Sequence, residues 1–117
     1  MLLNHNLDRR LKRYLTDYNV ATTQEQGWSD VLNGELLTLA ESNGFNVLLT
    51  ADSNIKNQQN FAVRRNAILV LRSFNNRRTT HAEMIGEIFR ALSGIRPGEL
   101  LEVFHQSITG SDAKNKL

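Results

Sequence analysis

The chain has 117 residues, a formal net charge of +2 and no cysteine. This length suits one domain with a real hydrophobic core, and the lack of cysteine excludes disulfides and cysteine-based zinc sites. No apolar run approaches the ~20 residues of a membrane helix, and the start MLLNHN becomes polar too early for a secretory signal. We therefore expect a soluble, cytoplasmic protein with no membrane partner.

Hydrophobic periodicity predicts alternating strands and helices without an internal repeat. The predicted strands cover residues 1–5, 18–23, 45–50, 67–71 and 99–105; the predicted helices cover 7–15, 33–43 and 80–93; residues 24–32 are predicted as a loop with Trp28 as its anchor. Asn33 suits an N-cap, Gly27 and Gly44 suit unusual backbone angles, and Thr80 with Glu83 has capping-box spacing.

Strands separated by helices favour right-handed crossovers and a parallel sheet. The near-continuous apolar strands at 45–50 and 67–71 indicate burial on both faces of that sheet. We predict an α/β fold, a three-layer α/β/α sandwich with a mainly parallel sheet of four to five strands. This domain would cover residues 1–105, followed by a frayed polar tail at 106–117.

Open parallel sheets bind ligands at the carboxyl ends of their strands. The residues that this rule gathers are Asn4, His5, Asn6, Glu35, Thr50 and Asp52. Glu35 and Asp52 form a carboxylate pair that could hold a divalent cation, which in turn could activate water against a phosphodiester. Structural explanations are also open, because the helix dipole favours Glu35 in a first turn and an Asx turn favours Asp52 after a strand.

Basic residues are gathered in three short segments. They are Arg9, Arg10, Lys12 and Arg13 in the first, Arg64 and Arg65 in the second, and Arg77 and Arg78 in the third. Such groups can meet phosphates, but solvated charges on a helix face and in loops explain them equally well.

The chain resembles the PIN-like predicted nucleases assigned to toxin–antitoxin systems, a compact branch of the PIN-domain superfamily. The resemblance covers roughly residues 2–104 and rests on LLNHNLDRRLKRYL, TTQEQGWSDVLNGELLTLAE, FNVLLTADSNIKNQQN and IRPGELLEV. It implies a parallel-sheet PIN fold, acidic residues that bind Mg²⁺ or Mn²⁺, and endonuclease activity, most readily on RNA.

By this resemblance Glu35 and Asp52 are the catalytic and metal-binding carboxylates. Relatives usually carry Asp-Glu where this chain has Asn4 and His5, so an amide carbonyl and an imidazole replace two carboxylates. This departure favours one weakly held ion, or none, over a two-metal site. The substrate-binding residues suggested by resemblance and position are Asn6, Arg9, Arg10, Thr50, Asn54, Gln58, Gln59 and Asn60.

Three functions stay open, and with them the question whether the protein is an enzyme. The first is a toxin-type, metal-dependent endoribonuclease with a weakened acidic site. The second is a decayed PIN-like module that binds RNA or a protein partner, such as an antitoxin, without cleavage. The third is a receiver domain phosphorylated on Asp52, although Asn4, His5 and His105 stand where receivers need two acids and a lysine. A homodimer also stays open.

Overall fold

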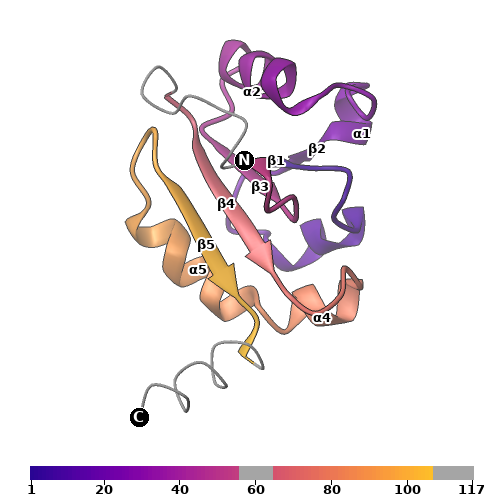
Figure 1. Ribbon diagram of the computed structural model, residues 1–117, viewed down its shortest axis with the longest axis vertical. Helices are drawn as coiled ribbons and strands as arrows, with labels where there is room; N and C mark the ends of the chain where they lie inside the picture. The colour runs from indigo at the N-terminus through magenta and orange to yellow at the C-terminus, as the bar shows by residue number, and fades with distance from the viewer. Residues whose placement is uncertain (56–64, 107–117) are drawn as a thin grey trace.

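The computed structural model describes residues 1–55 and 65–106. It is an α/β fold with one five-stranded, all-parallel sheet, as the sequence predicts. The strands are β1 (Leu2–Leu3), β2 (Ala21–Thr22), β3 (Val47–Thr50), β4 (Ala67–Arg72) and β5 (Leu100–Phe104). Their order across the sheet is β2-β1-β3-β4-β5 (Figure 1). The direction of winding therefore reverses between β1 and β3, and their carboxyl ends meet at this switch point.

The helices lie between the strands along the chain. They are the 3-10 helix η1 (Arg9–Tyr14) and the α-helices α1 (Thr23–Gln26), α2 (Asn33–Ser42), α4 (Arg78–Ala82) and α5 (Ile85–Gly94). None of the helices in the described ranges is long and apolar enough to cross a membrane. Of the predicted tail at 106–117, all but Gln106 lies outside the described residues.

Two hydrophobic clusters flank the sheet, because successive side chains of a strand point to opposite faces. Leu3 of β1 and Leu49 of β3 belong to one cluster, together with Leu11 of η1 and Ile88 of α5. The other cluster contains Leu2, Leu48 and Ile68 from the strands and Leu36, Leu37 and Ala40 from α2. The half-buried side chains of Trp28 and Phe45 pack against it. Trp28 meets Phe45 edge to face, as expected of a loop anchor.

The structure differs from the expected helices at their starts. The helix α1 begins at Thr23, within the predicted strand at 18–23, and runs into the predicted loop at 24–32. Its N-cap Thr22 forms a reciprocal capping box with Glu25. The capping box predicted at Thr80 is wrong, since Thr80 is buried inside α4 and a separate helix, α5, begins at Ile85. A motif of the right spacing caps a helix only where tertiary packing leaves its first residue extended.

The prediction that Asn33 is the N-cap of α2 is wrong, because Asn33 is the first helical residue. Leu32 is the N-cap, and its side chain forms no capping hydrogen bond. The amide of Asn33 instead bonds to Asp52, a partner that neither local propensity nor spacing indicates. The predicted unusual backbone angles are confirmed, with φ of +77° at Gly27 and +81° at Gly44.

Candidate functional site

Side-chain hydrogen bonds join the carboxyl ends of β1 and β3. The hydroxyl oxygen of Thr50 accepts from Nδ2 of Asn4 at 3.0 Å and from Nδ2 of Asn6 at 3.1 Å. It also accepts from the backbone N–H of Asp52 at 3.1 Å. Thr50 is fully buried and Asn4 is 2% exposed, so the bond between them is shielded from water, whereas the other two bonds are partly buried. Four of the predicted site residues thus meet around one hydroxyl group.

The amide oxygens of the two asparagines bind backbone N–H groups. Oδ1 of Asn4 accepts from the N–H of His5 at 2.7 Å, and Oδ1 of Asn6 accepts from the N–H of Ala51 at 3.1 Å. The carbonyl oxygen of Asn4, which the sequence suggests as a metal ligand, here fixes the turn that leaves β1. In this structure Asn4 and Asn6 act as bridges between two strand ends.

Asp52 is held from both sides. Its Oδ2 accepts from Nδ2 of Asn33 at 2.7 Å, and its Oδ1 accepts from the backbone N–H of Asn54 at 3.0 Å. The second bond is the Asx turn that sequence alone offers as a structural explanation. A carboxylate has about four lone-pair positions, so these two bonds leave Asp52 able to accept further donors or a cation. We call Asn4, Asn6, Asn33, Thr50 and Asp52 the amide cluster.

Glu35 and His5 lie beside the amide cluster in sequence but are not tied into it. Both are exposed, and their side chains form no hydrogen bond or ion pair within the part of the chain that the structure describes. Glu35 shares the first turn of α2 with Asn33, which contacts Asp52. Two residues turn an α-helix by about 200°, so Glu35 leaves α2 in a different direction from Asn33.

No group of three or more His, Cys, Asp or Glu side chains converges as a metal site in the described ranges. The available donors are one oriented carboxylate, Asp52, with the exposed Glu35 and His5 in adjoining segments. Oxygen donors of this kind suit a divalent ion that keeps most of its water ligands. Asn54 is exposed, whereas the remaining predicted residues, Gln58, Gln59 and Asn60, lie outside the described residues.

Arg9 and Arg10 differ although they are neighbours in η1. Arg10 binds both carboxylate oxygens of Asp8, at 3.0 Å through Nε and 2.7 Å through Nη2. These hydrogen bonds hold the pKa of Asp8 well below its usual range and raise the pKa of Arg10. Arg9 is exposed and has no such partner among residues 1–55 and 65–106. Its charge is therefore available to a ligand.

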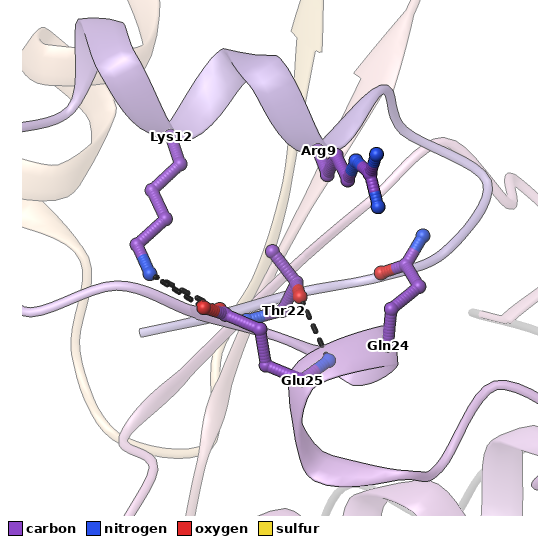
Figure 2. A pocket seen from close by; sticks show the side chains of 5 residues that line it. All are labelled: Arg9, Lys12, Thr22, Gln24 and Glu25. Atoms are coloured by element: carbon purple, nitrogen blue, oxygen red, sulfur yellow. Dashed lines mark hydrogen bonds and ion pairs between the residues drawn. The ribbon is translucent and has the colours of Figure 1, made fainter.

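A pocket of about 390 Å³ opens between η1 and α1 (Figure 2). Lys12 on one side forms an ion pair with Glu25 at 3.0 Å, and this hydrogen bond lowers the pKa of Glu25. Figure 2 shows the side chains of Arg9 and Gln24 pointing toward one another on the other side. Sequence reasoning missed the pocket, although Thr22 and Glu25 carry a readable capping-box spacing.

Two of the three basic segments come together in the structure. The helix α4 packs against η1 (Figure 1), and the charge of Arg78 helps to lower the pKa of Asp8. We call Arg9, Arg10, Arg77 and Arg78 the arginine face. The third segment lies apart, because Arg65 stands two residues before β4 and so lies near the amino end of that strand, while Arg64 lies outside the described residues.

Comparison with protein-family models, with curated proteins and with solved structures gave no match.

Proposed function

We propose that this chain is a PIN-like, three-layer α/β/α sandwich protein that acts in the cytoplasm as a metal-dependent endoribonuclease of toxin type, with a weakened acidic site. The two hydrophobic clusters, one with η1 and α5 and one with α2, support the layered arrangement. The switch point between β1 and β3 supports a ligand site at the carboxyl edge of the sheet.

One observation carries the proposal: the 2.7 Å hydrogen bond from Asn33 to Asp52. It joins the first turn of α2 to the end of β3, and Thr50 joins the end of β3 to that of β1. Three segments that carry the resemblance therefore meet at one place. Because Asp52 is oriented and keeps lone pairs that no described residue occupies, it is the residue most able to act on a substrate there.

A bound Mg²⁺ or Mn²⁺ would supply an activated water for cleavage of a phosphodiester. Asp52 would hold the ion, and the exposed side chains of Glu35 and His5 would complete or orient its water shell. Arg9 and Arg77, which have no carboxylate partner in the described ranges, would bind flanking phosphates. The amide cluster would keep Asp52 in place.

The test is cleavage of single-stranded RNA by the full-length protein with Mn²⁺ or Mg²⁺. We expect activity in the wild type, and losses of about 100-fold or more in Asp52→Asn, the order seen when a charge-stabilising group is removed. Glu35→Gln should lose activity to a smaller degree. Asp17→Asn is the matched control, because Asp17 is exposed and precedes β2, which places it at the opposite edge of the sheet. Equal activity in all four proteins would refute the assignment.

A second function is favoured by Asn4 itself. Its amide donates to Thr50 from a position that is 2% exposed, so a neutral hydrogen-bonding group fits the end of β1. On this alternative the protein binds RNA, or an antitoxin, without cleavage. The double variant Asn4→Asp/His5→Glu separates the two functions: RNA cleavage that arises only in this variant indicates a decayed site, whereas cleavage by the wild type excludes decay.

A further inference from the structure

Phe74 is the most exposed aromatic residue in the described part of the chain. Its side chain lies just past the end of β4 and is 65% exposed, compared with 43% for Tyr14 and 36% for Phe104. Its chain neighbours Ser73, Asn75 and Asn76 are polar. An exposed ring flanked along the chain by polar residues can stack on the flat face of a planar ligand.

The ring of Phe74 is held from the side by His105. The two rings meet edge to face, with centroids 5.3 Å apart and an angle of 86°. His105 is fixed in turn by Glu83, 2.9 Å from its Nε2, and by its backbone N–H, which donates to the carbonyl of Arg72 at 2.8 Å. An exposed aromatic ring that is ordered before binding loses little conformational entropy when a ligand stacks on it.

The segment that contains Phe74 is basic up to Glu83, the carboxylate that contacts His105. Residues 66–82 contain three arginines and no Asp or Glu. Arg72 is compensated by an ion pair with Glu102. Arg77, three residues after Phe74, is exposed and forms no ion pair with any residue that the structure describes, and its backbone N–H is fixed by Oδ1 of Asn75 at 2.9 Å. A free cation therefore stands close in sequence to an ordered ring.

We propose that Phe74 is a base-stacking site for single-stranded nucleic acid and that Arg77 binds a phosphate of the stacked nucleotide. Every base presents a π face, and stacking on an aromatic ring next to a cation is the common way to hold a single strand without reading its sequence. Phe74 follows β4, the neighbour of β3, so this subsite lies at the same edge of the sheet as the amide cluster. The inference rests on the proposed function in taking RNA as the strand.

The test measures binding of the full-length protein to fluorescently labelled oligo(A) RNA by anisotropy, in EDTA so that no cleavage occurs. Phe74→Ala should weaken binding by about 5- to 150-fold, and Phe74→Trp should restore it, because base stacking is lost and regained. Tyr14→Ala is the matched control, because Tyr14 is also an exposed aromatic residue but belongs to another segment, the last position of η1. Arg77→Gln should lower the slope of log affinity against log salt by about one. Urea unfolding of each variant confirms that the fold is retained.

If Phe74→Ala binds RNA as tightly as the wild type does, the inference is wrong. If, in addition, the wild type is a dimer and Phe74→Ala is a monomer, Phe74 belongs to a protein interface instead. Cleavage assays with Mn²⁺ keep the two proposals apart. A wild type that cuts RNA, with Phe74→Ala binding equally well, retains the nuclease function and rejects the stacking site. A wild type that binds through Phe74 without cutting retains the stacking site and rejects the nuclease.

Discussion

The amide cluster and the arginine face use their polar groups in opposite ways. In the amide cluster, Asn4, Asn6 and Thr50 direct their side-chain atoms to one another and to the backbone. On the arginine face, Arg10 is paired with Asp8, whereas Arg9 and Arg77 form no ion pair with any residue of the described ranges.

This difference suggests that the amide cluster supports the structure and that the arginine face binds ligands. Buried polar groups whose hydrogen bonds are satisfied internally fix geometry, and they have little capacity left for a ligand. Exposed cations without partners have that capacity, and a polyanion gains most from them. Asp52 combines both properties, because Asn33 and Asn54 orient it while some of its lone pairs have no partner among the described residues.

The largest expected effect concerns the support role. Thr50→Val keeps the shape of the side chain but removes the oxygen that accepts from Asn4, Asn6 and Asp52. A buried donor left without a partner costs about 1–3 kcal/mol, so the free energy of unfolding should fall by about 2–3 kcal/mol. Equilibrium unfolding in urea measures this change.

Thr79→Val is the control for this loss, because Thr79 is exposed in α4 and such surface substitutions usually stay within about 0.5 kcal/mol. If the two valine variants unfolded at the same urea concentration, the amide cluster would not be a structural support.

A smaller effect is expected on the arginine face, where paired and unpaired arginines should contribute differently. Arg9→Gln should weaken RNA binding several-fold and lower the salt slope by about one, because one phosphate contact is lost. The double variant Asp8→Asn/Arg10→Gln removes an ion pair with no net charge and keeps a good N-cap for η1, so it should bind almost as the wild type does. Anisotropy titrations at several salt concentrations compare them. Equal losses in both would mean that pairing with Asp8 does not withdraw Arg10 from RNA.

The sequence predicts the sheet better than it predicts the helix starts. Apolar runs such as 67–71 identify buried parallel strands because burial on both faces leaves no polar alternation. Capping-box spacing occurs at both Thr22–Glu25 and Thr80–Glu83, and only the first forms a cap. Local spacing cannot tell them apart, because what differs is the backbone: Thr22 is extended where β2 ends, whereas Thr80 is already helical inside α4.

The same limit applies to the site. The gathering of Asn4, Asn6, Thr50 and Asp52 follows from parallel strands that end at one edge, and the structure places these residues in one hydrogen-bonded network. The bond between Asn33 and Asp52 joins residues 19 positions apart and needs the packing of α2 to exist. Nothing local to Phe74 marks it as exposed, because an isolated Phe after an apolar strand is equally typical of a core residue.

The change of stability with pH tests the role of His81, a buried residue of α4, the helix that begins at Arg78. His81 is fully buried in α4, its Nε2 lies 3.3 Å from Oγ of Ser73, and its Nδ1 has no partner in the described residues. Burial, and to a smaller extent the charge of His105, lowers the pKa of His81 below the ordinary 6.5. Between these two pKa values the unfolded chain binds a proton that the folded chain excludes, so stability is complete above about pH 6.5 and declines as the pH falls toward the folded pKa.

His81→Gln should remove this part of the decline, because glutamine does not titrate, while His5→Gln, a change at an exposed position, should keep it. Urea unfolding of the three proteins at a series of pH values between about 7.5 and 5 measures the slope, and each is compared with its own stability at the upper end so that any packing cost of the substitution cancels. A decline in His81→Gln as steep as in the wild type would assign the effect to other groups. A flatter decline would assign the effect to His81, which lies in α4, the helix that packs against η1. The carboxylate of Asp8 is protonated only at lower pH, because its hydrogen bonds to Arg10 hold its pKa well below the usual range.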